Sequence, residues 1–97
     1  MEIKHIRNDN MFVAYDDDGS RAGTIEYSAK HDGNLYATHT WTDPQFRGQG
    51  VAAKLLDALV EYAVAQQVKI IPICSYVRRA FQDHPDKYAT VTADDTH

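Results

Sequence analysis

The spacing of apolar and polar residues predicts three strands in the first half of the chain. Met11 to Tyr15 is rich in β-forming residues and precedes the turn sequence Asp16 to Gly19, after which Arg21 to Ser28 resumes an extended pattern. A second turn, His31 to Asn34, leads into a third extended segment from Leu35 to Thr42. Together these segments predict an antiparallel β-meander.

A period of two assigns the side chains of the predicted strands to faces. In the third strand it predicts one face made of the odd-numbered residues Leu35, Ala37, His39 and Trp41. Trp41 is therefore expected in the core. In the second strand, Gly23 is expected to mark either a close backbone approach or a bulge, and Glu26 lies on the face opposite Ile25.

From Val51 to Gln66 the apolar residues recur with the period of a helix. Val51, Leu55, Leu59 and Tyr62 follow this spacing, and further apolar residues widen the stripe. The width of the stripe predicts a helix that is buried against a sheet.

The short β-branched run Lys69 to Cys74 predicts a strand parallel to the one before the helix, joined by a right-handed crossover. Pro72 cannot donate to a ladder, so an edge position or a local splay is expected there. Ser75 is expected to cap a shorter helix running to about Asp83, which His84-Pro85 ends. Residues 89–97 have weak apolar content and are predicted to be a frayed tail.

The whole chain, residues 1–97, is predicted to be a single small α/β (α+β) domain. Its formal net charge of -4 argues against a large nucleic-acid surface. There is no apolar run of the roughly 18 residues that a membrane span needs, and the first residues lack the apolar core of a signal peptide, so a cytoplasmic protein is expected. Cys74 is the one cysteine, either core filler or a reactive group.

The most informative stretch is the loop from Gln45 to Gly50, directly before the long helix. Glycines at 48 and 50 let an anion approach the backbone, the unpaired amides of a helix N-terminus favour negative charge, and Arg47 adds a charge-assisted contact. The loop is neither a P-loop nor a dinucleotide-binding fingerprint.

This loop and its context resemble the GCN5-related N-acetyltransferases. Gln45-x-x-Gly48-x-Gly50 is similar to the acetyl-CoA pyrophosphate loop of that superfamily. The chain is also similar to its small, YjdJ-type single-domain members through four segments, one of them in this loop: His39-Thr40, Arg47 to Gly50, Pro72-Ile73-Cys74 and His84-Pro85-Asp86-Lys87-Tyr88. The resemblance covers about Ala22 to Tyr88 and implies a minimal fold of this kind: meander, phosphate loop, long helix, strand and short C-terminal helix.

The resemblance implies a CoA-binding N-acetyltransferase that uses acetyl-CoA as substrate and an amine acceptor, either a small molecule or a protein. It points to Cys74 as an acetyl carrier, and the N-terminus of the following helix would favour its thiolate. His39 is the expected partner base, with His84 as second choice. The residues expected to bind the cofactor are Thr40, Trp41, Thr42, Gln45, Phe46, Arg47, Gly48, Gln49, Gly50, Val51, Ala52, Ser75, Tyr76 and Arg79.

Several alternatives stay open at this level. Cys74 could be a buried structural thiol, and Glu26 is an alternative general base for direct transfer to the amine. Arg78 and Arg79 could meet the phosphoadenosine part of CoA or could be ordinary surface charges. No metal-ligand spacing is seen. In larger members of the superfamily, helices between the first two strands help to enclose the acceptor site, and here only the turn from Asp16 to Ser20 occupies that place. The acceptor side is therefore expected to be open, which supports a second hypothesis, a non-catalytic CoA-binding module. A nucleotide-phosphate binder is the third hypothesis.

Overall fold

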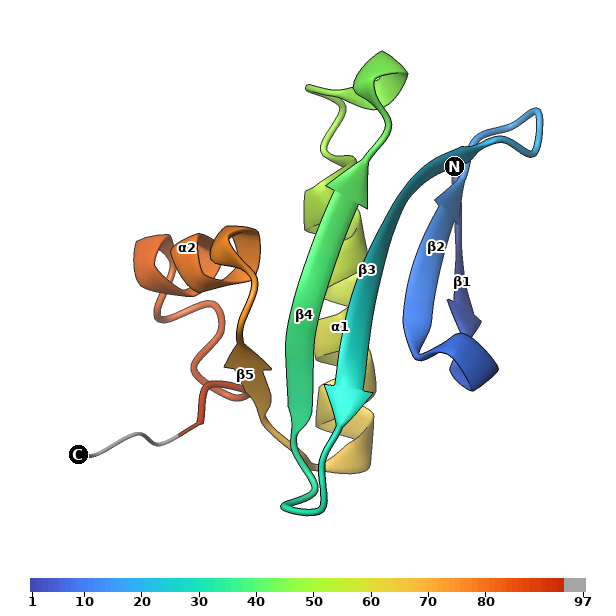
Figure 1. The fold of residues 1–97 in the computed structure, drawn as a ribbon. Helices are drawn as coiled ribbons and strands as arrows, with labels where there is room; N and C mark the ends of the chain where they lie inside the picture. The colour runs from blue at the N-terminus through green and yellow to red at the C-terminus, as the bar shows by residue number, and fades with distance from the viewer. Residues whose placement is uncertain (94–97) are drawn as a thin grey trace.

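One sheet with a long helix behind it forms the frame of the molecule (Figure 1). The computed structural model describes residues 1–93. Within them the strand order is β1-β2-β3-β4-β5. The strands are β1 (Glu2–Ile6), β2 (Met11–Tyr15), β3 (Arg21–Ala29), β4 (Leu35–Thr42) and β5 (Ile70–Pro72), and the helices are α1 (Val51–Gln66) and α2 (Ser75–Asp83), with 3-10 turns at η1 (Arg7–Asp9) and η2 (Pro44–Phe46).

The predicted α/β class, the meander, the helix from Val51 to Gln66 and the helix ending at Asp83 are confirmed. Strand β1 was not predicted; it pairs antiparallel with β2. A five-residue segment with Glu2, Lys4 and His5 has little strand propensity of its own. Its extended form depends on the free edge of β2, which sequence patterning does not reveal.

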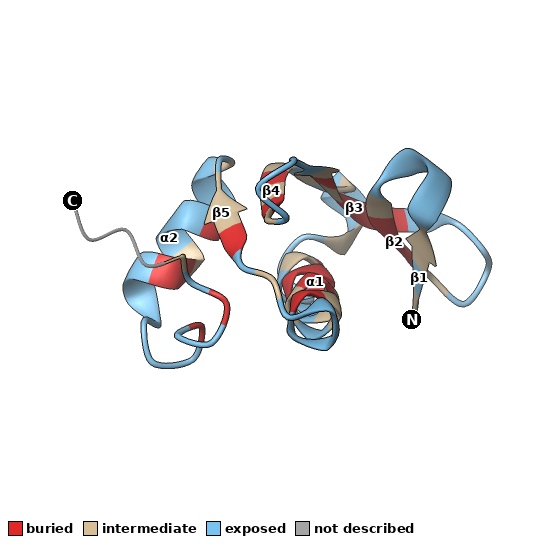
Figure 2. Cartoon of the chain, turned by 90° about the horizontal axis from the view of Figure 1, so that it is seen from below, coloured by how far each residue is buried: buried red, intermediate tan, exposed pale blue. Residues whose placement is uncertain are grey.

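Helix α1 packs its apolar stripe onto one face of the sheet. Its buried residues are Val51, Leu55, Leu56, Leu59 and Ala63, and Figure 2 shows buried positions where helix and strands face each other. Removing such a stripe from water is the main stabilising term of a small domain. Within residues 1–93, no helix combines the length and apolar character that crossing a membrane requires.

Gly23 lies where α1 packs tightly on the sheet. A Cβ atom added there would lie 2.7 Å from the carbonyl oxygen of Trp41 and 2.9 Å from Cγ1 of Val51. The predicted close approach is therefore confirmed. The β2–β3 register also shifts beside it, between Ala14 and Tyr15, so the chain has an irregularity there as well.

A bulge in β4 overturns the predicted faces of that strand. Glu26 pairs with His39 and Tyr27 pairs with Ala37, so Thr38 is the extra residue. Leu35 and Ala37 are buried on the α1 side, but the faces exchange after the bulge, and Trp41 is 45% exposed. The prediction of Trp41 in the core is wrong, because a period of two holds only for an uninterrupted ladder.

Strand β5 is parallel to β4, as predicted, and shorter than expected. It is the last strand in the sheet order, which suits Pro72. Pairing with β4 ends at Ala37, whose carbonyl oxygen accepts from the amides of both Ile73 and Cys74, at 3.0 and 2.9 Å. The two strands therefore separate beyond Ala37, which is the expected local splay.

Part of the predicted frayed tail is ordered against β5. Val91 is 1% exposed, its carbonyl oxygen accepts from the amide of Ile70 at 2.7 Å, and Thr92 forms a parallel bridge with Ile70. Burial of Val91 and these backbone contacts with β5 together hold the segment, although its neighbours are polar. Residues 94–97 of the predicted tail lie outside the described residues.

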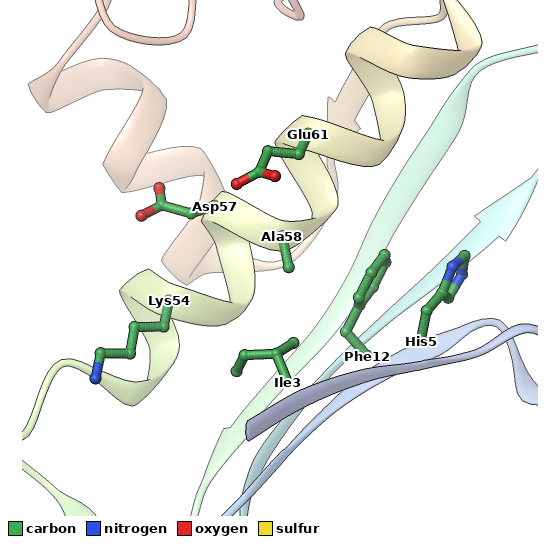
Figure 3. Close-up of a pocket in the computed structure, with 7 residues that line it drawn as sticks. All are labelled: Ile3, His5, Phe12, Lys54, Asp57, Ala58 and Glu61. Carbon is green, nitrogen blue, oxygen red and sulfur yellow. The ribbon is translucent and has the colours of Figure 1, made fainter. Parts of the chain in front are cut away.

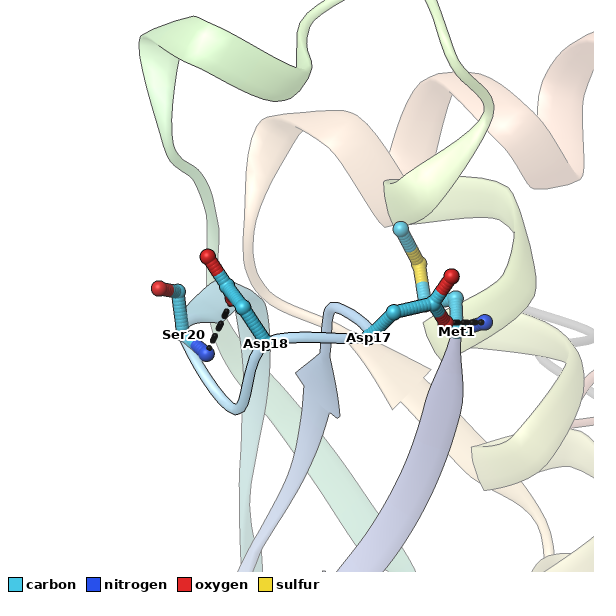
Figure 4. A network of polar contacts seen from close by, with 4 residues as sticks. All are labelled: Met1, Asp17, Asp18 and Ser20. Atoms are coloured by element: carbon cyan, nitrogen blue, oxygen red, sulfur yellow. Dashed lines mark hydrogen bonds and ion pairs between the residues drawn. The ribbon is translucent and has the colours of Figure 1, made fainter.

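The aspartate-rich turn between β2 and β3 is held by its own hydrogen bonds (Figure 4). The Asp18 carboxylate accepts from the amide of Ser20 at 2.9 Å, and this bond lowers the pKa of Asp18. Asp17 lies 3.5 Å from the amino group of Met1. The acidic run thus has a structural role in the turn.

Candidate functional site: the loop before α1 and the gap between β4 and β5

The loop that precedes α1 is built by a capped 3-10 turn and two glycines. The Asp43 carboxylate caps η2 by accepting from the amide of Gln45 at 2.9 Å. The chain then turns through Gly48 and Gly50, which have φ values of +82° and +74°. Both glycines would have open space around an added Cβ, so they are needed for backbone conformation and not for packing.

The loop leaves several backbone amide groups without acceptors at the N-terminus of α1. Gly50 is the N-cap of α1, and no side chain caps the helix. Within residues 1–93, the amides of Val51, Ala52 and Ala53 have no acceptor, and the first turn of α1 holds no acidic residue. The N-terminal end of a 16-residue helix with three open amides has the electrostatic character that favours an anion.

A pocket of about 250 Å³ lies at this helix end. It is lined by Thr42, Phe46, Arg47, Gly48, Gly50, Val51, Ala52, Ala53 and Tyr76. Eight of these were predicted from the sequence as cofactor-binding residues, and Ala53 was missed because its exposed methyl group carries no chemical signal. The other six predicted residues do not line this pocket: Thr40, Trp41, Gln45, Gln49, Ser75 and Arg79. Of the two in the loop itself, Gln45 donates its amide to the Asp43 carboxylate, and the amide of Gln49 donates to the Phe46 carbonyl at 3.3 Å.

Cys74 lies where β5 leaves β4. Its Sγ atom is 3.2 Å from Oγ1 of Thr40, and the residue is partly buried. Cys74, and not Ser75, is the N-cap of α2, so the predicted cap is corrected by one residue; Ser75 is exposed as the first residue of the helix. The structure therefore brings Cys74 and Thr40 together at the start of the gap between β4 and β5.

His39 is not the neighbour of Cys74 that the sequence suggested. Thr40 pairs across the sheet with the buried Ile25 on the α1 side, whereas His39 is exposed and pairs with Glu26 on the other face. The bulge at Thr38 causes this separation. Within residues 1–93, the one side-chain hydrogen bond of Cys74 goes to Thr40.

A second pocket, of about 310 Å³, adjoins the first along α2. The two share Ala53 and Tyr76, and Arg79 lines the second, with an ion pair of 3.6 Å to Asp83. Burial raises the pKa of Tyr76. The sequence prediction missed the other side chains of this pocket: Ala80, Asp83, Lys87 and Tyr88, with His84 considered there only as a base.

Arg78 has a structural contact. Its guanidinium donates to the carbonyl oxygen of Ile73 at 3.0 Å. This bond links the start of α2 to the end of β5. The phosphoadenosine contact predicted as an alternative for Arg78 and Arg79 stays a prediction. The bend between β5 and α2 is what places Cys74 beside Thr40.

A further pocket, of about 450 Å³, lies elsewhere, between the β1–β2 hairpin and α1 (Figure 3). His5 stacks on Phe12 at 4.1 Å between ring centroids and shares a 2.6 Å hydrogen bond with Tyr27. Burial, and then the charge of Arg7, lower the pKa of His5. Aromatic packing accounts for this histidine, and the cavity contains none of the predicted site residues. Among residues 1–93, no three His, Cys, Asp or Glu side chains gather as metal ligands would.

Comparisons of the sequence and of the fold with known proteins identify the family to which the chain belongs. The profile of a family described as GCN5-related N-acetyl-transferase matches residues 11–91, and the chain belongs to this acetyltransferase family. It is similar to the solution structure of a GCN5-like protein from Staphylococcus aureus, with 32% identity, a TM-score of 0.74, and coverage of 99% of this chain and 93% of that one.

Two larger acetyltransferases share the fold over part of their length. A nourseothricin acetyltransferase is 25% identical with a TM-score of 0.60, and the match covers 75% of this chain and 46% of that one. An acetyltransferase from Trypanosoma brucei is 19% identical with a TM-score of 0.56, covering 84% of this chain and 63% of that one. The minimal acetyltransferase fold expected from the sequence is thus confirmed.

Proposed function

We propose that this protein binds acetyl-CoA and transfers the acetyl group to an amine. The observation that carries the proposal is the open helix end at Gly50 to Ala53, whose pocket is lined by Arg47 and by Thr42, two residues along β4 from the Thr40 that contacts Cys74. This arrangement offers a phosphate site and a thiol along β4, within a family of acetyltransferases.

The chain's own groups fit the two ends of CoA. The open amides of α1, the loop glycines and the Arg47 guanidinium would hold the pyrophosphate. Because β5 pairs with β4 only through Ala37, the backbone of β4 from Thr38 to Thr42 is open on that side, and it would bond the pantetheine arm. The thioester would then reach Cys74, and Arg79 would lie toward the phosphoadenosine end.

Two routes of transfer follow from this placement. In a relay, the Cys74 thiolate attacks the thioester carbonyl, a new S–C bond forms, the bond to the CoA sulfur breaks, and the departing thiolate takes up a proton. The amine nitrogen then attacks the acetyl-cysteine, loses its extra proton, and releases Cys74. In direct transfer the amine attacks acetyl-CoA itself, and Glu26 or His39 accepts its proton.

Calorimetric titration tests the binding step. We expect acetyl-CoA to bind the wild-type protein, and Arg47→Ala to weaken binding by roughly tenfold, because one charge-assisted hydrogen bond is lost. Lys54→Ala, in the first turn of α1 and outside the pocket lining, is the matched control and should bind normally. Absence of binding at millimolar acetyl-CoA would refute the proposal, and equal competition by ATP would favour a nucleotide-phosphate binder.

The chemical step is tested at Cys74. If the relay operates, mass spectrometry after mixing with acetyl-CoA shows one acetyl group on the wild-type protein and none on Cys74→Ala, and the variant loses turnover. If Cys74→Ala keeps its turnover, direct transfer is the route. Binding of acetyl-CoA without acetylation of any amine would identify the alternative function, a non-catalytic CoA or acyl-CoA module.

A further inference from the structure

The two edges of the sheet differ in how they are protected against pairing with another chain. The edge strand β5 has three residues, contains Pro72, and is bridged on its outer side by Thr92. The other edge strand, β1, has five residues, contains no proline, and pairs with β2 without a register shift. In the part of the chain that the structure describes, no strand pairs with the outer side of β1. Its free backbone groups can therefore extend the sheet.

The charges of β1 are complementary to those of a second copy of the same strand. Glu2 and Lys4 are exposed, two residues apart, on the face away from α1. Ile3 and His5 alternate with them and line the pocket of about 450 Å³ on the α1 side. A second β1 that runs antiparallel about a two-fold axis can present Lys4 to Glu2 and Glu2 to Lys4. Opposite charges at facing positions stabilise a strand pair.

Ladder geometry and charge together select one register for such a pair. Backbone groups that face a partner strand recur at every second residue, so the two-fold axis must pass through a residue and not between two residues. An axis at Glu2 or at Lys4 makes like charges face each other, which destabilises the pair. An axis at His5 leaves both charges without a partner. An axis at Ile3 makes Glu2 face Lys4 twice, so it is the register that the sequence of β1 favours.

The same register covers the pocket beside β1. On the α1 side of the strands, the Ile3 side chains of the two copies meet at the axis, and Met1 of one copy faces His5 of the other. Met1 is 40% exposed in the single chain, and Phe12 and Ala58 line the pocket with Ile3 (Figure 3). Pairing thus removes apolar surface from water and also completes a ladder.

We propose that β1 is a self-association surface, at which two copies of this chain pair antiparallel about Ile3 and continue one sheet through both molecules. The sheet order puts β1 at the far end from β5, beside which α2 lies (Figure 1). Pairing therefore leaves Cys74 uncovered and does not depend on the proposed function. A pair of short strands buries less than the roughly 1,200–2,000 Å² of a stable interface, so the dimer should form only at high protein concentration.

Sedimentation velocity from micromolar to submillimolar protein tests the association. The wild-type protein should shift from monomer to dimer as the concentration rises. Lys4→Glu should weaken the dimer about tenfold or more, because two attractive pairs become two repulsive ones. The double variant Glu2→Lys with Lys4→Glu exchanges the charges and should restore wild-type association. Thermal denaturation of each variant checks that it is folded.

Lys30→Glu is the matched control for the charge reversal. Lys30 lies over the ring of Tyr36, 5.6 Å from the centroid, much as Lys4 lies 5.7 Å from the centroid of Tyr15. Lys30 is in the turn between β3 and β4, away from the β1 edge, so this variant should associate as the wild-type protein does.

Cysteine cross-linking tests the register. Facing residues of an antiparallel pair have Cα atoms about 4.5–5.5 Å apart, within the range of a disulfide. In a Cys74→Ala background, copper–phenanthroline should therefore oxidise the two thiols of Ile3→Cys to an intermolecular disulfide. Val64→Cys, at an apolar position of α1 that is 48% exposed, measures cross-linking by random collision and should react more slowly.

Three results would overturn the proposal. A wild-type protein that stays monomeric at submillimolar concentration would refute self-association and leave the edge to an extended segment of another protein. A dimer that Lys4→Glu and Lys30→Glu weaken equally would lie on a different face. Cross-linking of Ile3→Cys no faster than that of Val64→Cys would exclude pairing about Ile3.

Discussion

Gly23→Ala is expected to lower the free energy of unfolding by about 2–3 kcal/mol, the range of an overpacked core position. The added methyl group would lie 2.7 Å from the Trp41 carbonyl oxygen, 2.9 Å from Val51 Cγ1 and 3.2 Å from Leu55 Cδ1. The oxygen belongs to the backbone of β4 and cannot rotate away, so β3 and β4 must shift locally, and α1 must also move to make room beside Val51 and Leu55. For a domain of this size the melting temperature should fall by roughly 8–20 °C.

Gly33→Ala is the matched control for this substitution. Gly33 has a φ of +86°, but nothing lies within 4 Å of the added Cβ. Its cost is therefore backbone strain alone, about 1 kcal/mol. Thermal and urea denaturation of both variants measure the difference. If Gly23→Ala were no less stable than Gly33→Ala, the close approach of α1 to β3 and β4 would be wrong.

Gly48→Val is expected to weaken acetyl-CoA binding about tenfold to a hundredfold while the fold survives. A β-branched residue at a φ of +82° is strongly disfavoured, so the loop should relax and turn its amides from the phosphate. A hydrogen bond to a charged group contributes about 1.5–3 kcal/mol, and 1.4 kcal/mol corresponds to a factor of ten in affinity. Stability should fall by only about 1–2 kcal/mol, because the side chain has open space.

Gly19→Val is the control that distinguishes the effect of backbone strain from an effect on the acetyl-CoA site. Gly19 has a φ of +89° and equally open surroundings, but it lies in the β2–β3 turn. It should lose similar stability and keep wild-type affinity in the same calorimetric titration. If Gly48→Val and Gly19→Val bound acetyl-CoA equally well, the loop before α1 would not be the phosphate site.

Local patterns predicted most of this fold because they depend on neighbouring residues. The stripe from Val51 to Ala63 gave a helix with the observed ends, and the paired glycines gave the turn before it. The loop half of the candidate site followed for the same reason, since glycine conformation and helix-end amides are properties of a short segment. The face of β4 did not follow, because one extra residue at Thr38 reverses the alternation.

By itself, then, the sequence determined the order of the elements from β2 to α2, the glycine loop before α1 and the position of the single cysteine just after a strand. The tertiary structure decided which of these meet. Pairing with β3 created the bulge that parted His39 from Cys74, and the short β5 opened β4 beyond Ala37. The free edge of β2 drew Glu2 to Ile6 into the sheet, and burial of Val91 ordered part of the tail. Each of these depends on contacts between segments distant in sequence, where a local pattern carries no information.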